Sequence, residues 1–151
     1  MGRLSQLAEA SMIDSYRGVV RPHHLDHMGH MNVQWYTAKF DEATWHLFAA
    51  LGLTTAYFRQ ANRGMAALEQ TTKYLAEAMA GDLLACRSEV LEVREKTIRF
   101  LHHLHNAESD GLIASSELVA AHIALERRKA CPLPDAVKKE CQRLIERRGG
   151  G

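Results

Sequence analysis

The residues best suited to chemistry stand close together in the segment His23-His24-Leu25-Asp26-His27-Met28-Gly29-His30-Met31-Asn32. Asp26 brings a carboxylate, Gly29 lets the chain bend sharply, and Asn32 is a residue type that begins helices. A carboxylate beside the unpaired N–H groups of a helix N-terminus can activate water or attack a carbonyl, while an amide stabilises the resulting oxyanion. The segment therefore predicts a hydrolytic site.

One backbone amide follows from counting hydrogen bonds at the helix start. If Asn32 caps the helix, its side chain accepts a hydrogen bond from the N–H of Gln34 or Trp35. The N–H of Val33 is then left without an intrahelical partner, at the positive end of the helix dipole. Val33 is therefore the predicted oxyanion donor. A simpler interpretation of Asp26 also stands, in which it is a turn residue that bonds its own backbone.

The four histidines of this segment raise a second alternative, a metal site. His23, His27 and His30 could cluster around Asp26, with the ligand set completed from elsewhere in the chain. The same imidazoles, as neighbours of Asp26, would instead favour its ionised form. His30 and Asn32 are expected to organise the turn.

The elements that position these residues follow from hydrophobic periodicity. A strand is predicted over 14–20, stopped by Pro22, and a helix from the Asn32 cap to a stop at Gly52. Its apolar stripe comprises Tyr36, Phe40, Ala43, Leu47 and Leu51, widened by Trp35, Ala38, Trp45 and Phe48, with Lys39, Asp41, Glu42 and His46 largely off it. A stripe this wide predicts a helix covered on more than one side, as by a sheet wrapped around it.

Four further strands are predicted, over 65–76, 83–93, 97–106 and 112–127, followed by a polar helix over about 135–147. The breaks fall at Ala80-Gly81-Asp82, at Arg94-Glu95-Lys96 and at the hairpin signal Asp110-Gly111. His102 alternates with Ile98 and Phe100 on one strand face, which predicts a hydrogen-bonded core histidine. Short turns between strands predict an α+β fold with a mostly antiparallel sheet of about five strands.

Composition narrows the class of protein. The 151 residues suit a single domain, and a net charge of +1 gives no reason to expect a nucleic-acid partner. Cys86, Cys131 and Cys141 form no C-x-x-C pair, which favours a reducing cytoplasm over a disulfide framework. No apolar run approaches membrane-spanning length, and the first dozen residues lack the apolar core of a signal peptide.

The order of strand, D-x-x-G-H-x-N turn, long apolar helix and four-strand meander resembles the hotdog-fold acyl-CoA thioesterases of the 4-hydroxybenzoyl-CoA thioesterase class. The resemblance covers residues 14–135 and is carried by Asp26, Gly29, His30, Asn32, Tyr36, Phe40-Asp41-Glu42-Ala43, Gly81-Asp82, Lys96-Thr97-Ile98 and Leu133-Pro134. It implies a curved sheet around the central helix. It also implies homodimers whose sheets join edge to edge, or tetramers made of two such dimers. It also implies active sites at the subunit interface, with no metal or redox cofactor.

For the reaction, the resemblance implies hydrolysis of an acyl-CoA, with Asp26 as base or nucleophile and the Val33 amide as oxyanion donor. We expect the acyl pocket to involve Trp35, Tyr36, Phe40, Phe58, Met65 and Thr72, and the CoA phosphates to meet Arg94, Lys96 and Lys129. The sequence does not specify the acyl group of the substrate, although the aromatic residues would suit an aryl or a cationic acyl group. Two rival functions remain: a hotdog-fold enoyl hydratase or dehydratase, and a non-catalytic module that binds acyl-CoA or a small aromatic acid.

Overall fold

Five long strands and a short sixth form one antiparallel sheet in a computed structural model, which describes residues 11–149. The expectation about the first dozen residues therefore falls mostly outside the described part. The order across the sheet is β1 (Ile13–Val19), β3 (Leu83–Val93), β4 (Thr97–Asn106), β5 (Leu112–Ala124) and β2 (Arg63–Tyr74), with β6 (Lys129–Ala130) paired to β5. All pairs are antiparallel, as predicted.

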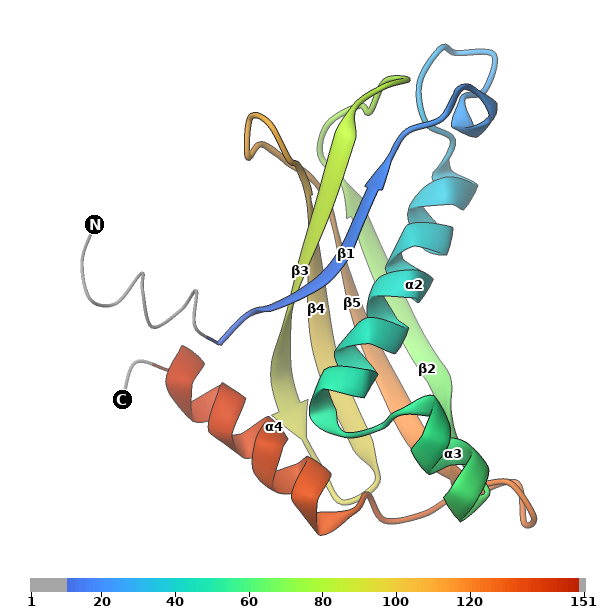
Figure 1. The fold of residues 1–151 in the computed structure, drawn as a ribbon, viewed down its shortest axis with the longest axis vertical. Helices are drawn as coiled ribbons and strands as arrows, with labels where there is room; N and C mark the ends of the chain where they lie inside the picture. The colour runs from blue at the N-terminus through green and yellow to red at the C-terminus, as the bar shows by residue number, and fades with distance from the viewer. Residues whose placement is uncertain (1–10, 150–151) are drawn as a thin grey trace.

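The long helix α2 (Val33–Leu51) lies along one face of the curled sheet (Figure 1). Asn32 caps it, since its Oδ1 accepts a hydrogen bond from the Gln34 amide at 3.1 Å, and Gly52 ends it at a φ of +102°. The five predicted stripe residues are all buried against the sheet. Three predictions about this helix are wrong: Ala38 and Trp45 are exposed, Trp45 to 47%, whereas Lys39 is only 5% exposed because it packs against Tyr16 of β1.

A row of polar side chains crosses the middle of the core. His102 on β4 is fully buried, and its Nε2 and Nδ1 lie 2.8 Å and 2.5 Å from the hydroxyls of Thr44 and Ser88. Ser88 in turn bonds Ser15 of β1 at 2.6 Å. Burial lowers the pKa of His102 to about 3, which keeps the ring neutral. The predicted core histidine is confirmed, and its row separates two apolar clusters.

The end of the sheet far from the Asp26 turn is closed by two helices, α3 (Thr55–Ala61) and α4 (Asp135–Arg148) (Figure 1). The sequence predicted α4, whose Val137, Cys141 and Leu144 join the core, but it did not predict α3. A single 3-10 turn, η1 (Pro22–His24), leads from β1 into the Asp26 turn. None of the described helices is long and apolar enough to cross a membrane.

Candidate active site

The Asp26 side chain is held on both oxygens by its own turn. Its Oδ1 accepts a hydrogen bond from the Met28 amide at 2.8 Å, and its Oδ2 accepts one from Asn32 Nδ2 at 2.9 Å. The turn is closed by backbone bonds from Gly29 to Asp26 and from Asp26 to His30. Gly29 adopts a φ of +87°, which side chains with a β-carbon rarely tolerate. These bonds fix the orientation of the carboxylate.

The same hydrogen bonds determine its charge. The bond from Asn32 first, and then the bond from the Met28 amide, lower the pKa of Asp26, with a smaller effect from the positive fields of His30 and His27. Donors to a carboxylate favour its ionised form. Asp26 is therefore a carboxylate at neutral pH. The turn bond to Met28 is the one that the simpler interpretation predicted, and it coexists with an ionised, accessible side chain.

The Val33 amide is the free donor at the start of α2. The Asn32 side chain accepts a hydrogen bond from the Gln34 amide at 3.1 Å, and its backbone carbonyl accepts one from the Trp35 amide at 3.0 Å. Within the described residues, no acceptor lies within hydrogen-bond distance of the Val33 N–H, and its side chain is 56% exposed. Nothing in this part of the chain competes with a ligand for that amide.

Asp26 and Val33 line one cavity of about 310 Å³, whose other walls are His30, Met31, Tyr36, Tyr74, Leu75, Ala76 and Glu77. The rings of Tyr36 and Tyr74 meet edge to face at 5.2 Å, and Tyr36 donates its hydroxyl proton to the Ala76 carbonyl at 3.4 Å. His30 Nε2 lies 3.4 Å from a Glu77 oxygen. The lining thus combines two carboxylates with aromatic faces and, among residues 11–149, contains no lysine or arginine.

The residues predicted for the acyl pocket do not come together. Only Tyr36 lines the Asp26 cavity, because Trp35 faces the other side of α2. Phe40 is wholly buried and stacks on His102, so it belongs to the core. The rest are elsewhere: Phe58 lies on α3 beside Trp45, Met65 lines a separate cavity of about 240 Å³ under α2, and Thr72 bonds Ser116 within the sheet.

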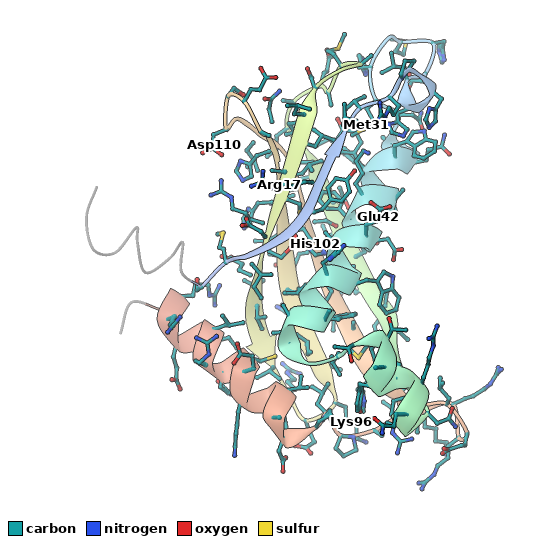
Figure 2. The ribbon with its side chains drawn as sticks, viewed as in Figure 1. Arg17, Met31, Glu42, Lys96, His102 and Asp110 are labelled. Atoms are coloured by element: carbon teal, nitrogen blue, oxygen red, sulfur yellow. The ribbon has the colours of Figure 1, made fainter. Side chains whose placement is uncertain are left out.

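The predicted phosphate-binding residues lie at the opposite end of the sheet from the Asp26 turn. In Figure 2, Lys96 is at the lower end of the sheet, and Met31, which belongs to the turn, is near the upper end of the sheet. Arg94 follows β3 at the same lower end of the sheet and forms an ion pair with Glu92 at 2.6 Å. Lys129 belongs to β6. Within one chain, none of Arg94, Lys96 and Lys129 lines the Asp26 cavity.

Sequence reasoning missed Tyr74, Leu75 and Glu77, which supply one wall of the Asp26 cavity. They stand at the end of β2 and just beyond it, where Met31 donates its amide hydrogen to the Ala78 carbonyl and draws the two segments together. That bond depends on the register of distant strands, so no local pattern reveals it. The signal that was available is the apolar pair Tyr74-Leu75 at the end of the strand predicted over 65–76.

Two observations bear on the alternative of a histidine metal site. Within residues 11–149, no three side chains of His, Cys, Asp or Glu are grouped closely enough to hold a metal ion. His24 instead accepts the Arg21 amide on Nδ1 at 2.9 Å and packs on Trp35, and His30 pairs with Glu77. His24 and His30 thus contact protein groups around the turn.

Known proteins resemble this chain in sequence and in fold. A family model, the thioesterase-like superfamily, matches residues 20–141. The betainyl-CoA thioesterase of Pseudomonas aeruginosa is 25% identical over 137 residues, which cover 91% of this chain and 86% of that protein. An L-carnitine dehydrogenase/betainyl-CoA thioesterase of Rhizobium meliloti is 28% identical over 122 residues, 81% of this chain. The chain spans about a quarter of that protein's length, since the match covers 24% of it.

Among solved structures, a hypothetical protein from Staphylococcus aureus in complex with CoA superposes with a TM-score of 0.82. Its identity is 19%, and the match covers 87% of this chain and 83% of that one. A likeness at this identity concerns the fold: a curled antiparallel sheet with a long helix on one face.

Proposed function

The chain belongs to the thioesterase-like superfamily and has the hotdog fold expected from its sequence, and on that premise we propose that it hydrolyses an acyl-CoA thioester to the free acid and CoA. The observation that carries this proposal is the shared cavity of Asp26 and Val33, which sets an ionised carboxylate beside a free helix N-terminal amide. A thioester carbonyl placed there meets both groups that hydrolysis requires.

The chemistry proceeds through a tetrahedral intermediate. Water attacks the carbonyl carbon as Asp26 takes its proton, or Asp26 attacks directly and water then hydrolyses the resulting anhydride. In both routes the negative oxygen of the intermediate accepts a hydrogen bond from Val33 N–H, with the dipole of α2 behind it. Collapse of the intermediate breaks the carbon–sulfur bond and releases CoA as a thiolate, which is then protonated. Gly29 and Asn32 hold the carboxylate in place for this attack.

The acyl group that fits the cavity best is small and cationic. Two carboxylates, Asp26 and Glu77, and the faces of Tyr36 and Tyr74 surround the space, and none of the described lysines or arginines is in the lining. Such a lining attracts a quaternary ammonium through charge and cation–π contact. The betainyl-CoA thioesterases among the relatives carry that group in their names. We include it in the proposal as the preferred substrate class.

A second copy of the chain completes the proposed site. Tyr74 and Leu75 line the Asp26 cavity at the end of the edge strand β2, yet they are 49% and 55% exposed. A partner sheet that paired with β2 would cover both and shelter the cavity from water. Assembly through this edge also accords with the homodimer, or dimer of dimers, that the resemblance implies.

The test is release of free thiol from a panel of acyl-CoAs that includes betainyl-CoA, acetyl-CoA and an aryl-CoA. Asp26→Asn keeps the size of the side chain and removes its charge, so we expect kcat to fall by about 10²–10⁴ with the fold intact. Asp14→Asn, an exposed aspartate on β1, is the matched control and should retain wild-type rates. An unchanged rate in Asp26→Asn rejects the mechanism, and binding without thiol release in the wild type points to an acyl-CoA binding module.

A further inference from the structure

Lys39 is a buried cation without an acidic partner. Its side chain projects from α2 toward β1 with 5% of the residue exposed. Its ammonium donates to the Tyr16 hydroxyl at 3.1 Å and lies 5.4 Å from the centre of the same ring. Within the described residues, no carboxylate lies within ion-pair distance of it. An ammonium carries three donors, so a nearly buried one that uses a single donor leaves two for another ligand.

The Lys39 side chain lines a cavity of about 270 Å³ between β1 and the first half of α2. Arg21 and His24 line the same cavity, as do Tyr16, Val19, Trp35, Ala38 and Glu42. His24 accepts the Arg21 amide on Nδ1, so its neutral ring carries the proton on Nε2 and keeps one donor. Three donor-bearing side chains thus converge on one small space, two of them cationic at neutral pH.

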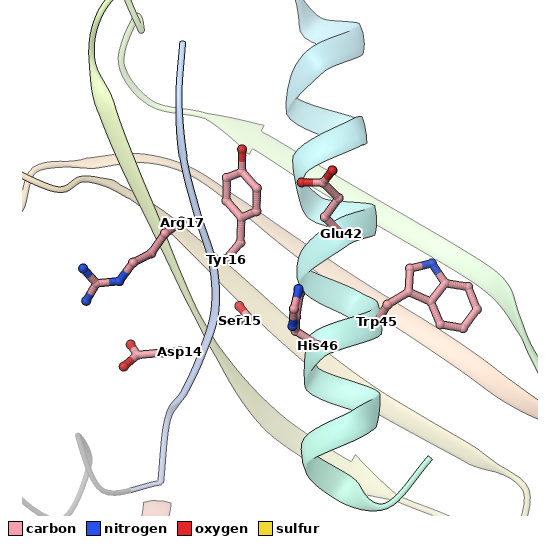
Figure 3. A pocket seen from close by; sticks show the side chains of 7 residues that line it. All are labelled: Asp14, Ser15, Tyr16, Arg17, Glu42, Trp45 and His46. Atoms are coloured by element: carbon pink, nitrogen blue, oxygen red, sulfur yellow. The ribbon is translucent and has the colours of Figure 1, made fainter. Parts of the chain in front are cut away.

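The electrostatics of this wall favour an anion. The pKa of His24 is lowered, mainly by burial. The positive charges of Lys39, His23 and Arg21 lower it further. The part of this lowering that comes from Lys39, His23 and Arg21 indicates a positive local field. Among the described residues, Glu42 is the one acid in the lining, and it is exposed. Glu42 also borders the next cavity along the same groove, with Asp14, Arg17 and His46 (Figure 3). The positive field is therefore concentrated at the Arg21 end.

We propose that this cavity binds a phosphate group, held by the Lys39 ammonium and the Arg21 guanidinium, with a donor from His24. The half-buried ring of Trp35, which packs on His24 at 4.4 Å, offers an aromatic surface beside it. A nucleotide phosphate matches this combination. The cavity opens on the β1 side of α2, whereas the Asp26 cavity is walled by the end of β2, so the two are separate sites.

Binding of adenosine 3′,5′-bisphosphate, measured by isothermal titration calorimetry, tests the proposal without reliance on turnover. We expect Arg21→Gln and Lys39→Gln each to raise Kd at least tenfold, and added salt to weaken binding in the wild type. Arg17→Gln is the matched control, because Arg17 is exposed on β1 and does not line the proposed cavity. It should leave Kd within twofold of the wild type. Arg21 is exposed, so its variant reports on the site even if Lys39→Gln is destabilised.

Equal affinity in all four proteins, or no binding by the wild type, overturns the proposal. Two sources can supply the phosphate, the nucleotide end of CoA itself or a free nucleotide. If adenosine 3′,5′-bisphosphate competes with acyl-CoA in the thiol-release assay, the cavity holds the tail of the substrate. If it binds without competing, the cavity is a separate nucleotide site. A wild type that binds the bisphosphate but releases no thiol refutes hydrolysis and leaves the phosphate site standing.

Discussion

At the scale of single residues, Asn32 links the helix to the chemistry. Its Oδ1 caps α2 through the Gln34 amide, and its Nδ2 donates to Asp26 Oδ2 at 2.9 Å. One side chain therefore begins the helix whose first amide faces the cavity and also holds the carboxylate beside it. The two functions can be separated experimentally because one affects stability and the other affects the pKa of Asp26.

Asn32→Ala should move the acidic limb of the kcat/KM profile to higher pH. The Asn32 hydrogen bond is the largest cause that lowers the pKa of Asp26, so its loss raises that pKa toward the ordinary aspartate value. In the wild type the carboxylate stays ionised, and activity persists, until the pH falls through the lowered pKa. Loss of the cap should also reduce the free energy of unfolding by about 1 kcal/mol.

The control for this variant is Gln34→Ala, which keeps the backbone amide that Asn32 caps. It should change neither the acidic limb nor the cap. Thermal melts and pH–rate profiles of the three proteins measure the two effects separately. A loss of stability in Asn32→Ala without any movement of the acidic limb would show that Asn32 only caps the helix.

Residues of the site were predictable where their geometry is local. Seven positions separate Asp26 from Val33, and a turn glycine and a cap between them constrain both groups, so the sequence alone indicated their roles. Lys39 was expected to lie off the buried stripe, because helical periodicity describes one helix by itself. The Tyr16 ring that buries this lysine comes from the strand β1. Tyr74 and Glu77 were missed because their place in the cavity depends on sheet register.

At the scale of elements, the polar row ties α2 to three strands of the sheet. Thr44 of α2, His102 of β4, Ser88 of β3 and Ser15 of β1 form a continuous chain of hydrogen bonds at buried positions. Hydrogen bonds demand specific partners, whereas apolar contacts do not. The row therefore fixes the position of α2 over the sheet, and with it the position of the Val33 amide.

Ser88→Ala should reduce the free energy of unfolding by about 1–3 kcal/mol, because it leaves His102 Nδ1 without its buried partner and leaves the Ser15 hydroxyl with the Cys86 carbonyl alone. Ser115→Ala on β5 removes a hydroxyl from the half-exposed face of the sheet and should change stability by less than about 0.5 kcal/mol. Chemical denaturation of both variants measures the difference. Equal small effects would mean that the row contributes nothing specific.

Elements with a clear period were predictable, and short ones were not. The strands β3 and β4 begin and end where turn residues and charge breaks placed them, and α2 runs between its predicted cap and stop. The helix α3 has two turns capped by Thr54, too few for an amphipathic period to emerge. The strand β2, rich in Ala, Leu and Glu, is a strand because β5 pairs along its whole length, a tertiary effect that overrides propensity.

At the scale of the whole molecule, the two edges of the sheet differ. The edge strand β1 is short and carries exposed charges at Asp14 and Arg17, features that discourage pairing with another chain. The other edge, β2, is 12 residues long and has an unpaired side. Leu68 on this strand is 62% exposed, and Tyr74 and Leu75 follow at its end. A long edge with exposed apolar residues is suited to a second copy of the chain.

Leu68→Glu tests whether this edge joins two chains and whether the site needs both. The substitution places a charge on β2 away from the residues that line the Asp26 cavity, so any loss of turnover must act through assembly. We expect light scattering to report half the wild-type mass and kcat/KM to fall at least tenfold, because Tyr74 and Leu75 lose their cover. Leu125→Glu, on a residue 47% exposed beyond the end of β5, should keep both the wild-type mass and rate. A monomer with full activity would separate catalysis from assembly, and an unchanged mass would locate the interface elsewhere.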